Sequence, residues 1–115
     1  MKYSVYQISL SDKDINEVNA EQPNAKYKAK MDMQFDFAGR GISGIASEAI
    51  NNDLYTKVCI IDADDLDTVF NIGNVGPEHK IERVSKMHSI SIGDVIIASD
   101  GSRNVVSNFG FQEVA

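Results

Sequence analysis

Three glycines in the first half of the chain have a spacing that can bind a phosphate group. Gly39, Gly41 and Gly44 match the pattern Gly-x-Gly-x-x-Gly, whose backbone N–H groups hold a pyrophosphate at the start of a helix. Asp62 follows the next apolar run, where a carboxylate would hold ribose hydroxyls. A plain flexible loop is the competing interpretation. We favour the loop because the residues after Asp62 look antiparallel rather than parallel.

The second group with a chemical capability consists of four aspartates, Asp62, Asp64, Asp65 and Asp67. Clustered carboxylates can bind Mg²⁺ or Ca²⁺, but the spacing lacks the glycine and the glutamate of an EF-hand loop. Asp62 is placed to cap a helix, and Asp64 and Asp65 fall in its first turn, where carboxylates are favourable. We therefore predict neither a metal nor a cofactor, and we expect the four aspartates to contact a protein partner.

Candidates for nucleophilic catalysis are few. His88 lies beside Ser89 and Ser91, and Asp94 would complete a Ser-His-Asp set, but such sets depend on geometry rather than on neighbouring positions. The chain has no Gly-x-Ser-x-Gly elbow. These observations weigh against an enzyme without deciding the question.

The composition is that of an ordinary globular protein. The chain has 115 residues, of which 43% are apolar and 24% charged, so we expect one domain over residues 1–115. No apolar run approaches the roughly 20 residues of a membrane span, and the start of the chain lacks the apolar segment of a secretion signal. We expect a cytoplasmic protein without membrane contact. Cys59 lies in an apolar run, which favours a buried thiol over a nucleophile served by His79 or His88.

The charge of the chain restricts its partners. The formal net charge is -6 and the isoelectric point is near 4.7, so a phosphate backbone would be repelled. We therefore expect no direct binding to nucleic acid. The same charge attracts a protein with a basic surface.

The first half of the chain predicts one strand and up to three helices. Residues 4–10 alternate as a half-buried strand, and a short helix follows Ser11 and ends before Pro23. Residues 25–37 fit a helix with a stripe every fourth residue, or a strand of alternating residues; we favour the helix through Met33. Residues 45–52 predict a further helix.

The second half predicts a mainly antiparallel arrangement. A buried strand over 55–61 precedes a helix that Asp62 caps and Gly73 closes, and residues 78–87 form a loop or a short helical turn. Asp100-Gly101 predicts a two-residue hairpin that pairs Ile96 with Val105, and a last strand covers 109–114. We expect a small α+β fold: a mostly antiparallel sheet with a C-terminal β-meander and three to four short helices.

The second half of the chain resembles proteins of a known family. The segment Met87-His88-Ser89-Ile90-Ser91-Ile92-Gly93-Asp94-Val95-Ile96, with Asp100-Gly101 and Ser107-Asn108-Phe109-Gly110-Phe111 after it, resembles the YodL-like family of phages and mobile elements. Upstream, residues 55–58, 64–70 and 73–78 are similar to small phage-encoded proteins, so the likeness covers the second half. It implies an accessory factor, with no catalytic residues to carry over.

These expectations define one leading hypothesis and two alternatives. The leading hypothesis is a non-enzymatic acidic protein that binds or inhibits a host protein, of the anti-restriction or anti-CRISPR type, through Asp62 to Asp67. The first alternative is a small nucleotide- or metal-dependent enzyme that uses the loop from Gly39 to Gly44 or the aspartates. The second is a homodimer formed through an exposed edge strand.

Overall fold

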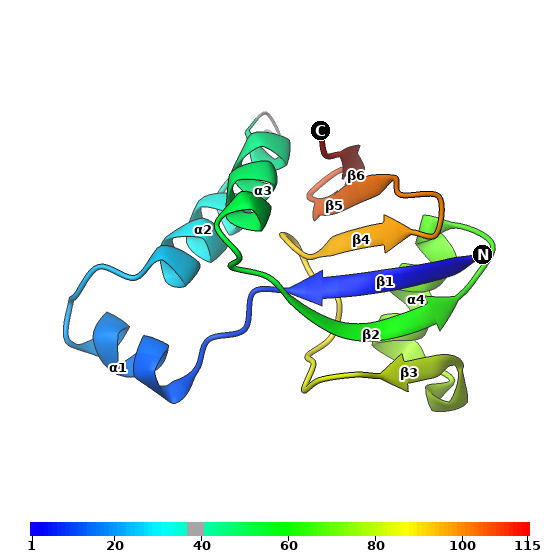
Figure 1. Ribbon diagram of the computed structural model, residues 1–115, viewed down its shortest axis with the longest axis horizontal. Helices are drawn as coiled ribbons and strands as arrows, with labels where there is room; N and C mark the ends of the chain where they lie inside the picture. Colours follow the sequence, from blue (N-terminus) through cyan, green and yellow to red (C-terminus); the bar gives the residue numbers. More distant parts are fainter. Residues whose placement is uncertain (37–40) are drawn as a thin grey trace.

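The computed structural model describes residues 1–36 and 41–115, which form one six-stranded sheet and four α-helices (Figure 1). The strands are β1 (Lys2–Gln7), β2 (Thr56–Asp62), β3 (Ile81–Arg83), β4 (Val95–Ala98), β5 (Arg103–Ser107) and β6 (Gly110–Glu113). The helices are α1 (Asp12–Asn19), α2 (Ala25–Gln34), α3 (Ile42–Asn51) and α4 (Leu66–Val75), with a 3₁₀ turn η1 (Glu78–Lys80) before β3.

The strand order is β3-β2-β1-β4-β5-β6, and every neighbouring pair is antiparallel. The last three strands in the chain are neighbours in the sheet, joined by two hairpins. The structure therefore confirms a small α+β fold with a C-terminal β-meander. Among the described residues, no helix combines the length and the apolar character required to cross a bilayer.

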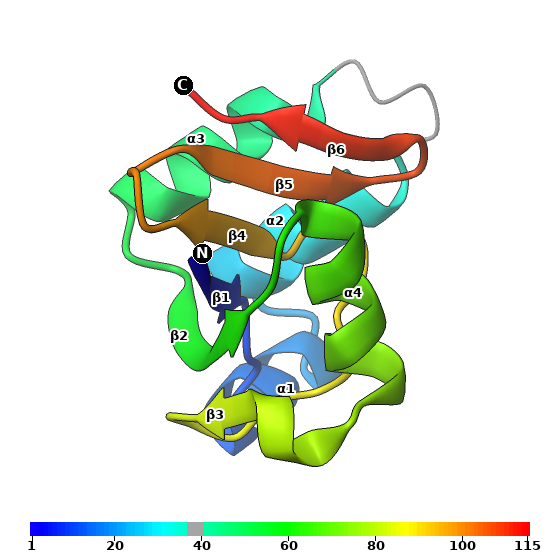
Figure 2. The ribbon, with the colours of Figure 1, turned by 90° about the vertical axis from the view of Figure 1, so that its right-hand side faces the viewer.

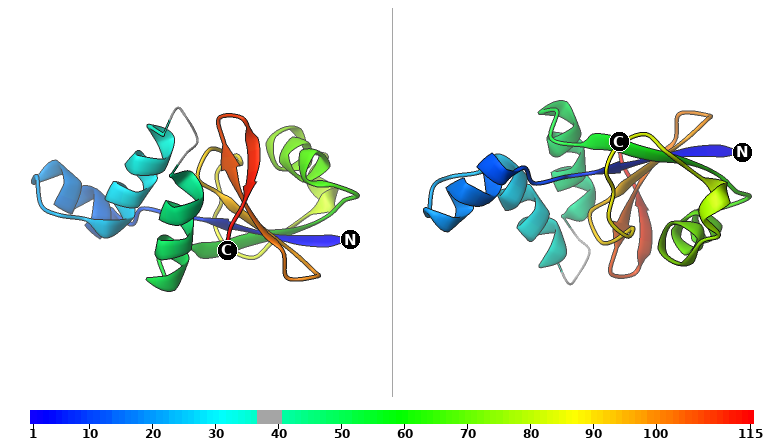
Figure 3. Two further views of the ribbon diagram at one scale, coloured as in Figure 1. Left: turned by 90° about the horizontal axis from the view of Figure 1, so that it is seen from above. Right: turned by 90° about the horizontal axis from the view of Figure 1, so that it is seen from below.

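Helices cover both faces of the sheet. Figure 3 shows α2 and α3 on one side of the strands and α4 on the other. Consecutive residues of β4 and β5 therefore face different cores: Val95 and Val105 pack toward α2 and α3, whereas Ile96 and Val106 pack toward α4. Burial on both faces explains why these strands have continuous apolar runs instead of alternating ones.

The first two helices begin as the sequence predicts. Ser11 caps α1 in a reciprocal arrangement, because its Oγ accepts from the N–H of Asp14 at 3.1 Å and the Asp14 carboxylate accepts from the N–H of Ser11 at 2.8 Å. Asn24 caps α2 through the N–H of Tyr27 at 2.9 Å. The helical interpretation of residues 25–33 is confirmed, and the strand alternative is wrong over residues 25–34.

Helix α4 differs from the prediction at both ends. Asp62 is the last residue of β2, and the cap is Asp65, whose Oδ1 accepts from the N–H of Thr68 at 2.8 Å. The helix continues past Gly73 to Val75 and ends at Gly76, whose φ of 97° is left-handed. Gly73 instead allows close packing, because a Cβ there would lie 2.2 Å from Cδ1 of the buried Ile90.

The hairpin at Asp100-Gly101 forms, but its register differs from the prediction by one residue. Val95 pairs with Val105, and Ile96 pairs with Asn104. The carbonyl of Ala98 accepts from the N–H of Gly101 at 2.9 Å, and Gly101 has a φ of 91°. This is a three-residue loop with glycine in the left-handed position, and the extra residue shifts the pairing.

Strand β3 was not predicted. It has three residues, Ile81 to Arg83, and pairs with Cys59 to Ile61 of β2 at the edge of the sheet. The segment is polar, and only the half-buried Ile81 packs against the core on the α4 side. Edge strands are often short and charged, so local sequence carries little signal for them.

Candidate functional site

The four predicted partner-binding aspartates do not share one structural role. Asp65 caps α4, and the Asp62 carboxylate lies 3.3 Å from the amino group of Met1. Asp64 and Asp67 are exposed and contribute charge to the surface at the start of α4. Among the residues that the structure describes, no three carboxylate, histidine or cysteine side chains converge as ligands for one metal ion.

The three predicted cofactor-binding glycines do not lie in a βαβ unit. Gly39 lies outside the described residues. Gly41 is the N-cap of α3 and donates its N–H to the Asp36 carboxylate at 2.9 Å, and Gly44 lies inside the first turn of α3. Helix α2, not a strand, precedes the motif, and β2 after it pairs only in the antiparallel direction. The parallel architecture that holds a dinucleotide at such a motif is therefore missing from the described chain.

Of the Ser-His-Asp set that the sequence suggests, only Asp94 is buried, in a polar cluster with Gln7, whereas His88 and Ser89 are exposed and Ser91 is half-buried. The Asp94 carboxylate, in a residue that is 2% exposed, accepts from the side-chain amide of Gln7 at 3.0 Å and from the N–H of Ser91 at 2.9 Å. Gln7 also brackets the backbone of His88: it donates to the carbonyl at 2.8 Å and accepts from the N–H at 3.1 Å. These bonds join β1 to the segment before β4.

The cluster shifts the protonation of two side chains. Burial raises the pKa of Asp94 to about 6, although the Ser91 N–H and the charge of His88 oppose this effect. Burial, with a smaller contribution from the charge of Asp94, raises the pKa of the Tyr55 hydroxyl, which donates to the carbonyl of Gly93 at 2.6 Å. Tyr55 therefore stays protonated and fastens the turn before β4.

Cys59 is buried, as the apolar run around it predicts. Burial raises the pKa of its thiol to about 11, so the reactive thiolate is scarce at neutral pH.

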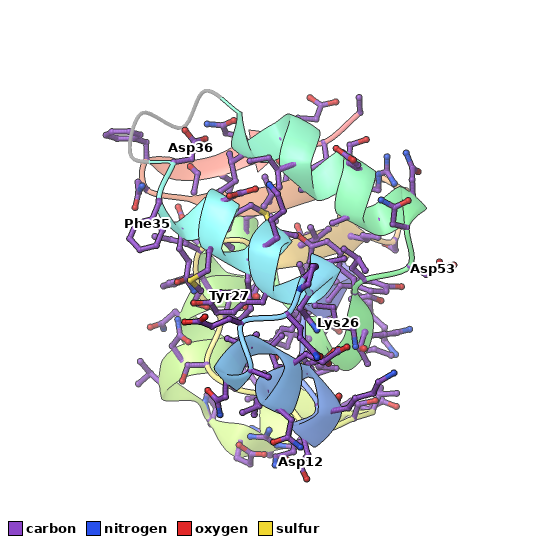
Figure 4. All side chains as sticks on the ribbon, turned by 90° about the vertical axis from the view of Figure 1, so that its left-hand side faces the viewer. Asp12, Lys26, Tyr27, Phe35, Asp36 and Asp53 are labelled. Carbon is purple, nitrogen blue, oxygen red and sulfur yellow. The ribbon has the colours of Figure 1, made fainter. Side chains whose placement is uncertain are left out.

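An apolar groove of about 510 Å³ lies between the end of α2, helix α4 and strand β5. Its floor contains Ile90, Ile92 and Val106, and two aromatic side chains, Phe35 and Phe70, form its sides. We call this feature the aromatic groove, and define it by Gln34, Phe35, Phe70, Ile90, Ser91, Ile92, Val106 and Ser107. In Figure 4, Phe35 lies at the outline of the molecule, beside Asp36 and the end of α2.

The turn between β5 and β6 carries a third exposed phenylalanine, Phe109, two residues after Ser107 of the groove lining. Figures 2 and 3 show this turn beside the end of α2 and on the side of α4. The Asn108 amide donates to the Asp36 carbonyl at 3.2 Å, so the turn is fastened to the residue after Phe35. Phe109 in this turn is 75% exposed and Phe35 is 66% exposed. Several exposed aromatic side chains in one region of the surface are characteristic of interaction sites.

Helix α4 connects the aromatic groove to the acidic residues. Phe70 contacts Phe111 edge to face, with the ring centres 6.5 Å apart, and this contact fixes one side of the groove. Asp67 lies one turn before Phe70 and therefore on the same side of α4. An acidic side chain thus flanks the apolar surface.

Comparisons of this chain with protein-family models, with curated proteins and with solved structures found no match.

Sequence reasoning missed both the aromatic groove and the Gln7 cluster. Gln7 has a recognisable signal: it takes the inward position after Tyr3 and Val5 in an alternating strand, where an apolar residue is usual. Phe35, Phe70 and Phe109 have no such signal, because the groove depends on three segments that meet only in the folded chain.

Proposed function

We propose that this chain is a protein-binding domain whose docking surface is the aromatic groove with its acidic flank. The single observation that carries the proposal is the exposure of Phe35 and Phe70 around one apolar hollow, with Phe109 exposed in the turn that follows Ser107 of its lining. Phenylalanine burial contributes about 1.5–3 kcal/mol per side chain, and the fold does not use most of that gain at Phe35 and Phe109, which are 66% and 75% exposed. A partner that covers the groove would gain this free energy of burial.

Helix α2 extends this surface along its length. Tyr27 and Met31 precede Phe35 at intervals of four residues, so the three side chains lie on one face of the helix. Tyr27 is 38% exposed and Met31 is half-buried, whereas Ala29 and Met33 make the contacts with the core. The stripe that the sequence predicts on this helix is therefore partly exposed, and a second protein can contact it.

Charge defines the chemistry of the partner. Asp64 and Asp67 are exposed at the start of α4, one or two helical turns before Phe70. The whole chain has a net charge of -6. The partner surface should therefore have an apolar anchor for the groove and basic side chains beside it. From the resemblance of the second half of the sequence to the YodL-like family, we further propose that the partner is a host protein, bound or inhibited in an anti-restriction or anti-CRISPR manner.

A capture experiment with three variants tests this function. The immobilised chain is exposed to host lysate at low and moderate salt, and the retained proteins are identified. The variant F35S/F109S removes two exposed aromatic side chains of the docking surface. The matched control I15S/V84S removes two exposed apolar side chains from other parts of the surface, where Ile15 is 44% and Val84 is 54% exposed.

We expect at least one protein that the wild-type chain and I15S/V84S retain and that F35S/F109S loses. D64N/D67N should retain the same protein less well at low salt, and the difference should shrink as salt screens the charges. If F35S/F109S and I15S/V84S retain the same proteins as the wild-type chain, the docking surface is not the aromatic groove.

A further inference from the structure

A second hollow, of about 320 Å³, lies where the chain leaves β1 and passes α2 and the segment before β4. It shares no lining residue with the aromatic groove. Ile8, Leu10 and Met87 give it an apolar part, and Lys30, Lys86 and His88 give it a cationic part; Ser9 completes the lining. We call it the cationic pocket.

Hydrogen bonds hold the walls of the cationic pocket in place. Gln7 pairs with both backbone groups of His88, at 2.8 and 3.1 Å, and so fixes the wall that carries Met87 and His88. Ser9, also in the lining, accepts a hydrogen bond from Nζ of Lys26 at 3.4 Å. Ile8, at 2% exposure, belongs to the core on the α2 side. The hollow is therefore a fixed feature of the fold rather than a gap between mobile loops.

The charge of the cationic pocket is opposite to that of the whole molecule. The chain has 17 acidic and 11 basic residues, yet the pocket lining contains two lysines and a histidine and no carboxylate. Asp94 is the nearby acid: burial raises its pKa, and the Ser91 N–H and the charges of His88 and Lys30 lower it. Lys86 has no such role, and within the described chain neither lysine forms an ion pair with a carboxylate.

We propose that the cationic pocket binds a small amphipathic anion, meaning a molecule with a carboxylate head and a short apolar body. The head would lie between Lys30 and Lys86, beside His88. The body would cover Ile8, Leu10 and Met87. A purely inorganic anion would leave the apolar part exposed, and a neutral apolar molecule would leave the lysines without a counter-charge, so the lining selects for both properties together.

Titration with octanoate tests the proposal, with octanol and inorganic phosphate as the comparison probes. The amide NMR signals of the ¹⁵N-labelled chain report the location of binding. We expect octanoate to shift the signals of Ser9, Leu10, Met87 and His88, and the other two probes to shift them only at much higher concentrations. The variant K30Q/K86Q should weaken octanoate binding by about tenfold. The control K13Q/K80Q, which removes the same charge from two exposed sites elsewhere, should bind octanoate within twofold of the wild-type chain.

Four results would overturn the proposal. Octanol binding as tightly as octanoate would show that the lysines do not recognise a charge. Phosphate binding as tightly as octanoate would show that the apolar lining contributes nothing. Equal octanoate affinity in K30Q/K86Q and K13Q/K80Q, or shifts confined to other parts of the chain, would place any bound anion outside the cationic pocket.

Discussion

The side-chain amide of Gln7 donates to the Asp94 carboxylate at 3.0 Å, inside the fold and between residues at opposite ends of the chain. Together with the two bonds from Gln7 to the His88 backbone, it joins the end of β1 to the start of the C-terminal meander. The same bonds place one wall of the cationic pocket. Gln7 therefore links the stability of the fold to the shape of that pocket.

We expect Gln7→Met to destabilise the protein by about 3 kcal/mol. Methionine has a similar length, so packing is kept, but the Asp94 carboxylate loses one of its two hydrogen bonds and the backbone of His88 loses both of its bonds to Gln7. Urea denaturation measures the free energy of unfolding. Gln22→Met, at an exposed position, is the control and should change this free energy by less than about 0.5 kcal/mol. Equal effects at the two positions would mean that the Gln7 cluster carries no stability.

The protonation of Asp94 predicts an unusual dependence of stability on pH. Its pKa is raised from 3.8 to about 6, so between these values the folded chain holds a proton that the unfolded chain has released. The free energy of unfolding should therefore fall as the pH rises through this window, by about 3 kcal/mol for a shift of two units.

Asp94→Asn isolates this contribution, because asparagine can accept the same two hydrogen bonds without a charge. The carboxylates with lowered pKa values, including Asp65 and Asp100, lose their stabilising effect in acid in both proteins, so they cancel in the difference. We expect the wild-type chain to lose stability relative to Asp94→Asn between pH 4 and pH 6, and the difference to be constant above pH 7. A difference in the free energy of unfolding that stays constant from pH 4 to pH 8 would contradict a raised pKa for Asp94.

Two glycines in helices predict opposite results for the same substitution. Gly44→Ala should stabilise the protein by about 0.5–1 kcal/mol, because a Cβ at this position in α3 meets nothing within 4 Å and alanine favours the helix. Gly73→Ala should destabilise it by about 1–3 kcal/mol, because its Cβ would overlap the side chain of Ile90. Thermal unfolding of both variants checks the sign of each effect. Stabilisation by Gly73→Ala would show that α4 can move away from Ile90 at little cost.

The parts of the fold that the sequence predicts correctly are those with a local cause. Ser11 and Asp14 form a reciprocal cap within one turn of the chain, and the runs before and after Asp100-Gly101 are too rich in β-branched residues for another structure. The helix over residues 25–34 follows from its alanine and lysine content.

The errors occur where two local solutions are close in energy or where tertiary packing decides. A two-residue and a three-residue loop both place Gly101 in the left-handed region, and the sequence does not separate them. Asp62 and Asp65 can each cap a helix, but β2 pairs with β1 as far as Asp62, so the cap moves to Asp65. The aromatic groove could not be predicted, because its sides come from α2 and α4, on opposite faces of the sheet.

Phe35 and Phe109 should contribute little to the stability of the fold. F35S/F109S should unfold within about 1 kcal/mol of the wild-type chain, since both side chains are mostly in water already. Urea denaturation of this variant and of the control I15S/V84S measures the effect. A loss of several kcal/mol in F35S/F109S alone would assign these side chains to the fold rather than to a partner.

Photo-crosslinking from the aromatic groove tests the central claim most directly. The chain is produced in host cells with p-benzoylphenylalanine in place of Phe35 or Phe70, and in place of Ile15 on α1 as the control position. We predict that irradiation links positions 35 and 70 to the same host protein, and that position 15 gives no such product. Adducts to different proteins at the two groove positions, or the same adduct from position 15, would contradict a docking surface at the aromatic groove.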